Sequence, residues 1–133
     1  MSYLLDTNTC IRYLNGQSES IRGKLESKQP EEIVVCSVVK AELFYGALKS
    51  ARANENLEKA HRFLDRLVSL PFDDNASEEY GKVRSKLEMA GTPIGPNDLL
   101  IAAIAVVRRV ILVTHNTKEF GRVKGLKLED WEK

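Results

Sequence analysis

Four acidic residues of this chain lie beside apolar runs, where a carboxylate is unexpected: Asp6, Glu42, Asp98 and Glu119. Asp6 follows Leu4 and Leu5, and Asp98 precedes the run 99–103. A carboxylate among apolar residues costs free energy unless a partner compensates it, and several together cannot stay ionised without a cation. Oxygen ligands suit hard cations such as Mg²⁺. These residues therefore predict a metal-dependent enzyme that cleaves phosphodiester bonds.

The composition predicts one globular domain spanning residues 1–133. Hydrophobic residues make up 43% of the chain and charged residues 29%, which is enough apolar material for a core. The net charge of +1 means that overall charge does not indicate a nucleic-acid binder. A local basic surface around an acidic pocket remains compatible with these numbers.

The two cysteines, Cys10 and Cys36, are expected to be reduced thiols in the core. The absence of a CxxC motif or a Cys/His cluster argues against a zinc site. The N-terminus has no basic segment followed by an apolar one, and no apolar run is long enough to cross a bilayer. We therefore expect a soluble, cytoplasmic protein.

Strands and helices alternate along the chain. Apolar and β-branched runs predict three strands and a final edge strand, at residues 2–6, 33–36, 110–114 and 126–128. Helical spacing predicts the intervening helices, at residues 7–14, 18–27, 37–48, 56–70, 75–90 and 98–109, and a short turn or helix at 116–120. The expected N-caps of the later helices are Ser37, then Asn75 or Ser77, then Asn97.

This alternation predicts an α/β fold with a parallel sheet covered on both faces. Ligands of such sheets bind beyond the carboxyl ends of the strands. Asp6 ends the first strand, and Glu119 follows the third. Glu42 and Asp98 lie in helices that leave or return to that same edge, so we expect all four acids to meet there.

Four segments then resemble a known family. Their sequences are LDTN at residues 5–8, AELFYGA at 41–47, PNDLLIAA at 96–103 and LVTHNTKEF at 112–120. They are similar to the motifs of PIN-domain ribonucleases, and in particular of the VapC toxins of bacterial type II toxin–antitoxin modules. The resemblance follows the family's order over nearly the whole chain.

The resemblance implies a three-layer α/β/α PIN-like domain around a mostly parallel sheet. It also implies an endoribonuclease that depends on Mg²⁺ or Mn²⁺ and cleaves structured RNA, either tRNA or rRNA. A cognate VapB-like antitoxin would cover the active site, and the toxin would form a homodimer.

The family's acids carry over to Asp6, Glu42 and Asp98. Asp6 and Asp98 are assigned as direct metal ligands, and Glu42 and Glu119 as water-mediated ligands or as groups that orient the attacking water. Many PIN domains have Asp where this chain has Asn116, and toxins of this subgroup often carry the acid three residues later. The fourth position therefore stays open between Asn116 and Glu119, as does the choice between one ion and two.

Polar neighbours of these acids are expected to contact phosphate or to hold the carboxylates in place: Thr7, Asn8, Thr114 and Asn116. Eight basic residues are candidates for the rim of the pocket: Lys40, Lys49, Arg52, Arg108, Arg109, Lys118, Arg122 and Lys124. A mixed-charge surface without RNA contact explains about half of them equally well.

Each residue also has a simpler explanation. Asp6 alone would be a helix cap, Glu42 a solvated helix residue and Asp98 an acid stabilised by a helix dipole. His61 lies in a charged helix and is expected to be solvated, and His115, although near the proposed site, fits a surface role at least as well.

Packing is the simplest role for the aromatic residues Tyr45, Phe120 and Trp131. The helices carrying Phe44 and Phe63 are expected to leave an apolar face for a partner or a second copy, although core packing explains many of the same positions.

Two other functions remain. One is a phosphatase or DNA-directed nuclease that uses the same acids, and the other is an RNA-binding module without activity. Comparing RNA, DNA and small phosphoesters as substrates separates the first, and absence of Mg²⁺ and Mn²⁺ binding would favour the second.

Overall fold

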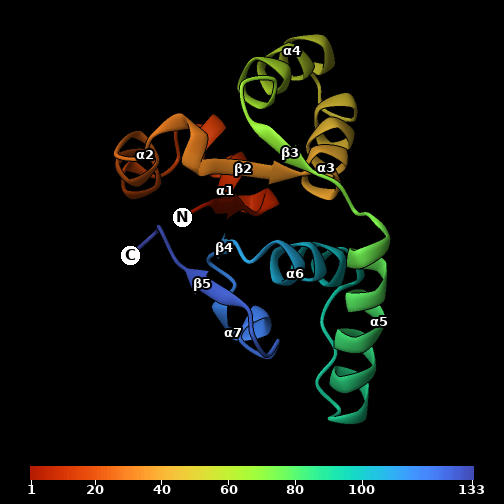
Figure 1. Cartoon of the computed structure of the whole chain (residues 1–133). Helices are drawn as coiled ribbons and strands as arrows, with labels where there is room; N and C mark the ends of the chain where they lie inside the picture. Colours follow the sequence, from red (N-terminus) through yellow and green to blue (C-terminus); the bar gives the residue numbers. More distant parts are fainter.

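The computed structural model describes residues 1–133 and contains one five-stranded sheet (Figure 1). The strands are β1 (Tyr3–Leu5), β2 (Ile33–Cys36), β3 (Val68–Leu70), β4 (Ile111–Val113) and β5 (Lys127–Glu129). They lie in the order β3-β2-β1-β4-β5, and every neighbouring pair is parallel. The predicted α/β fold is confirmed, and the sheet is wholly rather than mostly parallel.

Seven α-helices and one 3₁₀ turn connect these strands. They are α1 (Thr7–Leu14), α2 (Glu19–Glu26), η1 (Pro30–Glu32), α3 (Ser37–Leu48), α4 (Ala53–Leu64), α5 (Asp74–Met89), α6 (Pro96–Arg108) and α7 (Thr117–Phe120). Right-handed crossovers place α1 to α4 on one face of the sheet and α5 to α7 on the other. Figure 1 draws α1 to α4 in the upper half, with β2 and β3, and α5 to α7 in the lower half, with β4 and β5. The result is a three-layer α/β/α sandwich.

The central strands and helix α6 make up the middle of the core, and the other helices add buried residues to it. Every residue of β2 and β4 is buried, as expected for parallel strands covered on both faces. The C-terminal tail is anchored by Trp131, which is 2% exposed. The hydroxyl of Ser20 donates a hydrogen bond of 2.6 Å to the carbonyl oxygen of Trp131. The tail therefore packs against α2 and stays near the end of β4.

The predicted helix 56–70 is wrong at both ends. Helix α4 begins at Ala53 and ends at Leu64, and the last residues of the prediction form strand β3. The backbone amide of Leu67 donates a hydrogen bond to the carbonyl of Leu64 in the turn between α4 and β3. Leu67 therefore fits the helical spacing of apolar residues although the helix has already ended. Strand β3 is a three-residue edge strand with two exposed side chains, too short to show an alternating pattern.

Three predicted caps are also wrong. Ser37 is the first residue of α3, whose N-cap is Cys36. Helix α5 is capped by Asp73, which accepts a 3.0 Å hydrogen bond from the amide of Ala76. Helix α6 begins at Pro96, a residue suited to a first helical turn because it lacks an amide proton. Asn97 is therefore inside the helix, and its side chain is free to bind elsewhere.

Several residues lie as predicted, and one does not. Cys10 and Cys36 are buried and free, and burial raises the pKa of both thiols. Phe120 and Trp131 are buried packing residues. Tyr45, predicted to pack, is 66% exposed. No helix of the structure combines the length and the apolar character needed to cross a membrane.

Candidate active site

The strand order opens a crevice at the carboxyl edge of the sheet, between β1 and β4. Strand β2 lies on one side of β1 and strand β4 on the other. The connections that leave these strands therefore run in opposite directions on the two sides of this point in the sheet. Asp6 follows β1 and Thr114 follows β4. The amide of Asp6 donates a 3.1 Å hydrogen bond to the carbonyl of Val113, which fixes the two strand ends side by side.

Asp6 lies at the bottom of this crevice as the N-cap of α1. It is 7% exposed, and one carboxylate oxygen accepts a 2.8 Å hydrogen bond from the amide of Thr9. Burial raises the pKa of Asp6, and hydrogen bonds from the side chains of Thr114 and Thr9 oppose that rise only in part. Asp6 is thus both a helix cap and a buried carboxylate facing the site.

Glu42 connects three helices. It lies in the second turn of α3, and its Oε1 accepts a hydrogen bond from the hydroxyl of Thr7 on α1. Its Oε2 accepts a 3.0 Å hydrogen bond from the side-chain amide of Asn97 on α6. Both oxygens of the Glu42 carboxylate are therefore held by hydrogen bonds. Because Thr7 is next to Asp6 in the sequence and Asn97 is next to Asp98, these bonds fix the direction of the carboxylate relative to both aspartates.

Asp98 lies in the first turn of α6 and experiences the charges of the other three acids. Its pKa is raised to about 6, first by burial and then by the charges of Glu119, Asp6 and Glu42, in that order. No hydrogen bond from the protein reaches its carboxylate, so both oxygens are available to a ligand. The charges of the other three predicted acids therefore all reach Asp98.

Glu119 and Asn116 share the fourth side of the cluster. The side-chain amide of Asn116 donates a 3.2 Å hydrogen bond to Oε2 of Glu119. The backbone amide of Asn116 in turn donates a 3.0 Å hydrogen bond to the hydroxyl of the buried Thr114. Glu119 thus supplies the charge at this side, and Asn116 fixes its position.

No basic side chain neutralises the four acids. None of the nine ion pairs of the structure includes Asp6, Glu42, Asp98 or Glu119. Asp98, whose pKa the other three acids raise, therefore needs another source of positive charge to be fully ionised. A donor set made only of oxygen atoms fits a hard divalent cation such as Mg²⁺ or Mn²⁺.

Two hollows meet at helix α1 beside the acids. One, of about 580 Å³, is lined by Asp6, Asn8, Ile11, Arg12, Gln17, His115, Asn116 and Glu132; we call it the Asp6 cleft. The other, of about 700 Å³, is lined by Thr7, Ile11, Ser37, Val38, Ala41, Glu42, Tyr45, Gly46, Lys49, Asn97 and Leu100; we call it the Glu42 groove. Ile11 borders both, Asp6 lines the first hollow and Glu42 lines the second.

Most of the eight predicted basic residues lie elsewhere. Only Lys49 lines one of the two hollows, and Arg108 pairs with Asp73 at 2.9 Å. The basic residue of the Asp6 cleft is Arg12, which the sequence did not indicate because it lies alone in an amphipathic helix. Thr9 and Asn97 were also missed as contacts of the acids, and only their closeness in sequence to Asp6 and Asp98 pointed to them.

Comparison with known proteins places this geometry in a family. A model of the PIN domain matches residues 3–126. The chain is 42% identical to "Ribonuclease VapC2" of Rickettsia felis over the full length of both. It is 37% identical to the "tRNA(fMet)-specific endonuclease VapC" of Salmonella typhimurium, with 98% of each chain covered.

Solved structures show the same likeness. The fold superposes on a chain of DNA-bound VapBC from Salmonella typhimurium with a TM-score of 0.92, at 37% identity over 98% of each chain. It superposes on a chain of VapBC2 from Rickettsia felis, bound to a promoter DNA fragment, with a TM-score of 0.90. That match has 40% identity and covers 98% of this chain and 99% of the other. The chain therefore belongs to the PIN-domain family, within its VapC ribonuclease branch.

Proposed function

We propose that this protein is the toxin of a type II toxin–antitoxin module and a divalent-cation-dependent endoribonuclease. The observation that carries the proposal is the set of four acids without a basic partner, seen in the raised pKa of Asp98. A partly buried anionic cluster of this kind can stabilise a cation bound beside a phosphodiester. The ribonuclease names of the full-length relatives support the same activity.

Asp6 and Asp98 would hold the cation, which is Mg²⁺ with Mn²⁺ as a substitute. When bound, it supplies positive charge to the scissile phosphate and lowers the pKa of a bound water. Asp98 has two oxygens without protein partners, and Asp6 has one oxygen fixed by the amide of Thr9.

Glu42 and Glu119 would orient the attacking water. Glu42 is held by Thr7 and Asn97, and Glu119 by Asn116, so each carboxylate keeps a defined direction. We propose that Glu119 fills the fourth acid position because Asn116 donates to it. Thr114 holds the backbone of this segment, and Asn8, exposed in the Asp6 cleft, would contact phosphate.

The substrate would be structured RNA, tRNA or rRNA. One relative carries tRNA(fMet) in its name, which makes a tRNA the first substrate to test. The Asp6 cleft is open, and its polar lining of Asn8, Asn116 and Arg12 suits a sugar–phosphate backbone.

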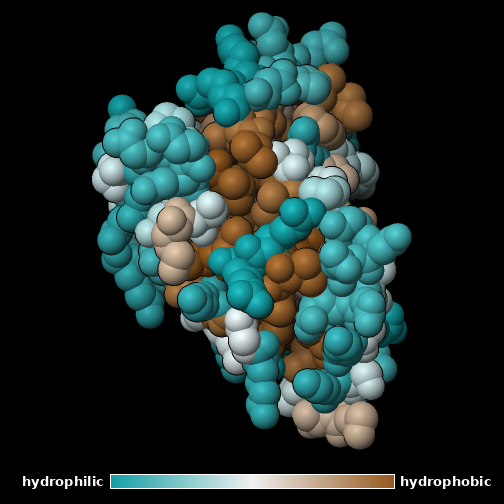
Figure 2. All heavy atoms as spheres, viewed as in Figure 1, coloured by the Kyte–Doolittle hydropathy of each residue, from teal (hydrophilic) through white to brown (hydrophobic).

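A VapB-like antitoxin would bind the apolar groove between α1, α3 and α4. Ile11, which lines this groove, is 38% exposed, and Tyr45 and Leu48 of α3 are 66% and 60% exposed. Figure 2 shows apolar atoms in a band beside the charged helix α4. Because Glu42 lines this groove, a bound segment would cover the acids. We also expect a homodimer of single-domain protomers, as in the family.

The test is cleavage of total bacterial RNA by the purified chain, with Mg²⁺, with Mn²⁺ and with EDTA. Asp98→Asn removes one predicted ligand, and Asp65→Asn, an exposed acid at the end of α4, is the matched control. Discrete new 5′ ends that require both metal and Asp98 support the proposal. Equal cleavage by Asp98→Asn would refute the metal site, and preferential cleavage of DNA or a small phosphoester would refute the RNA substrate.

A further inference from the structure

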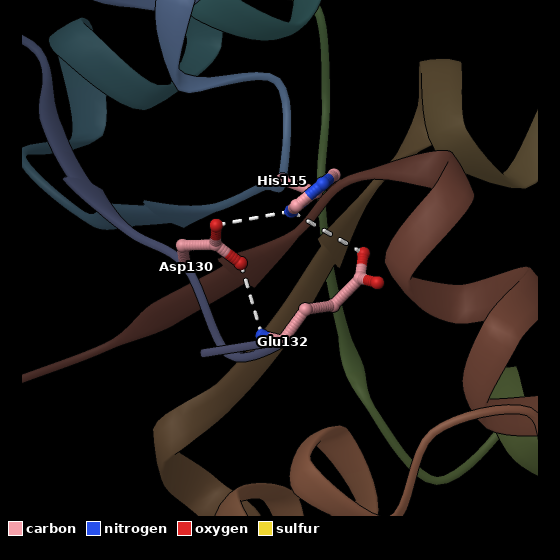
Figure 3. Close-up of side chains that lie close together, drawn as sticks. All are labelled: His115, Asp130 and Glu132. Atoms are coloured by element: carbon pink, nitrogen blue, oxygen red, sulfur yellow. Dashed lines mark hydrogen bonds and ion pairs between the residues drawn. The ribbon is translucent and has the colours of Figure 1, made fainter.

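A second cluster of possible metal ligands lies along the Asp6 cleft. It consists of His115, just after β4, and of Asp130 and Glu132 in the C-terminal tail (Figure 3). Nδ1 of His115 lies 3.0 Å from Oδ2 of Asp130 and 3.8 Å from Oε2 of Glu132. All three ligand atoms lie within 4.8 Å of one another. None of them belongs to the four-acid cluster.

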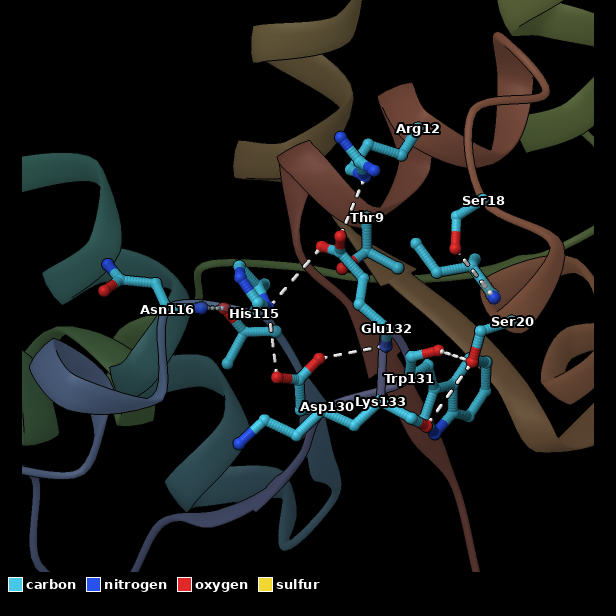
Figure 4. Close-up of polar contacts among 12 residues, drawn as sticks. Thr9, Arg12, Ser18, Ser20, His115, Asn116, Asp130, Trp131, Glu132 and Lys133 are labelled. Carbon is cyan, nitrogen blue, oxygen red and sulfur yellow. Dashed lines mark hydrogen bonds and ion pairs between the residues drawn. The ribbon is translucent and has the colours of Figure 1, made fainter.

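The two carboxylates are largely buried, and the backbone of the tail holds that of Asp130 in place. The side chain of Asp130 is only 8% exposed and that of Glu132 is 17% exposed. Oδ1 of Asp130 accepts a 2.9 Å hydrogen bond from the amide of Glu132, and Trp131 between them is buried (Figure 4). The amide of Thr114 donates a 2.9 Å hydrogen bond to the carbonyl of Glu129, which ties the segment of His115 to the tail.

The separations suit one small cation. Zinc binds histidine nitrogen and carboxylate oxygen at about 2.0–2.2 Å, so tetrahedral ligands lie roughly 3.3 Å apart. The observed separations of 3.0 and 3.8 Å bracket that distance. A donor set of one imidazole and two carboxylates is typical of zinc and similar transition metals, whereas magnesium prefers oxygen alone.

Arg12 does not block such an ion. Its Nε lies 3.0 Å from Oε1 of Glu132, whereas Oε2 is the oxygen that faces His115. Two carboxylates and one guanidinium leave a net charge of −1 beside the imidazole, which favours a divalent cation. The imidazole is 63% exposed, so the site is accessible. His115 and Glu132 both line the Asp6 cleft, which leaves room for water or a phosphate oxygen as a further ligand.

We propose that His115, Asp130 and Glu132 form a second metal site, selective for Zn²⁺-type cations, at the rim of the Asp6 cleft. The sequence argued against a zinc site because cysteine-containing zinc motifs are absent. That argument does not apply to a site made of one histidine and two carboxylates. The site does not depend on the nuclease activity, and its occupant would lie next to the path of any phosphate entering the cleft.

The test is zinc binding by untagged, metal-free protein, measured by competition with a chromophoric chelator and by the visible spectrum of bound Co²⁺. The chain has only two histidines, so His61→Gln is a matched control for His115→Gln. Asp98→Asn separates this site from the four-acid cluster. Circular dichroism of each metal-free variant establishes that it is folded.

We expect the wild type, His61→Gln and Asp98→Asn to bind zinc at this site, and His115→Gln and Glu132→Gln to bind it at least about tenfold more weakly. The Co²⁺ spectrum of a nitrogen-containing site should disappear in His115→Gln alone among the histidine variants. Binding by His115→Gln equal to that of the wild type would overturn the proposal, as would zinc binding that Asp98→Asn abolishes. Absence of zinc binding by the wild type would show that the cluster is only an ion-pair network.

Discussion

The side-chain amide of Asn97 donates a 3.0 Å hydrogen bond to Oε2 of Glu42, across 55 residues of sequence. Glu42 accepts its other hydrogen bond from Thr7, so one carboxylate joins the N-terminal turns of α1 and α6. The neighbours of these donors, Asp6 and Asp98, are the proposed metal ligands. The spacing of the ligands thus depends on a residue that does not itself have to bind the metal.

Removing the donor on α6 should reduce cleavage without unfolding the protein. We expect Asn97→Ala to lower kcat/KM for RNA by roughly tenfold, because Glu42 loses one of its two fixed hydrogen bonds. Asn97 is exposed, so the thermal midpoint should change little. The matched control is Asn54→Ala in α4. Cleavage rates of Asn97→Ala equal to those of Asn54→Ala would show that the contact has no role in positioning.

Without metal, stability should fall as the pH rises from about 4 to about 6. The pKa of Asp98 in the folded protein is raised from 3.8 to about 6, so the folded state binds more protons than the unfolded state in this window. The stability contributed by protonated Asp98 is fully present below pH 3.8 and is lost as the pH rises past about 6. The raised pKa of Asp6 acts in the same direction.

Asp98→Asn isolates this effect. At pH 7.5 in EDTA the variant should be more stable than the wild type by ~1–2 kcal/mol, allowing for solvent screening of a partly exposed group. At pH 3.5 the difference should vanish. Urea unfolding at the two pH values measures it, and a difference that does not change with pH would contradict the raised pKa.

Divalent metal should stabilise the folded chain. Mg²⁺ or Mn²⁺ at ten times its dissociation constant contributes about 1.4 kcal/mol, or a rise in Tm of about 3–6 °C for a chain of this size. Asp6→Asn should abolish most of this rise, because the variant removes a ligand and part of the repulsion that the cation relieves. Differential scanning fluorimetry across a metal titration tests this, with Ca²⁺-free buffers and EDTA as the baseline. An equal rise in Asp6→Asn would place the ion elsewhere.

Glu119 and Asn116 can be separated by substitution. Glu119→Gln removes the charge that raises the pKa of Asp98 most among the three other acids. The variant should lower kcat by on the order of 10²-fold. Asn116→Ala keeps that charge and removes only its 3.2 Å hydrogen bond, so a smaller loss is expected. Single-turnover cleavage of one RNA gives both values. The reverse order would assign the fourth position to Asn116.

The fold follows largely from short-range sequence patterns. The β-branched run Ile33–Cys36 and the apolar run before Thr114 have few alternatives to buried parallel strands. Asp6, Glu42, Asp98 and Glu119 lie beside apolar segments of predicted strands and helices, which is why the sequence predicts them at one edge of the sheet. Strand β3 was missed because an edge strand of three residues buries too little to leave a pattern.

The contacts that fix the site depend on residues far apart in the chain, and only the tertiary structure decided them. The sequence predicts Asn97 as a helix cap because asparagine favours the N-cap position. The helix instead begins at Pro96, which leaves the side-chain amide of Asn97 free to bind Glu42. His115 meets Asp130 and Glu132 only because β5 pairs with β4 and carries the tail past the cleft. Sequence patterns record which residues are buried together along one element, whereas hydrogen bonds between elements depend on distances that only packing sets.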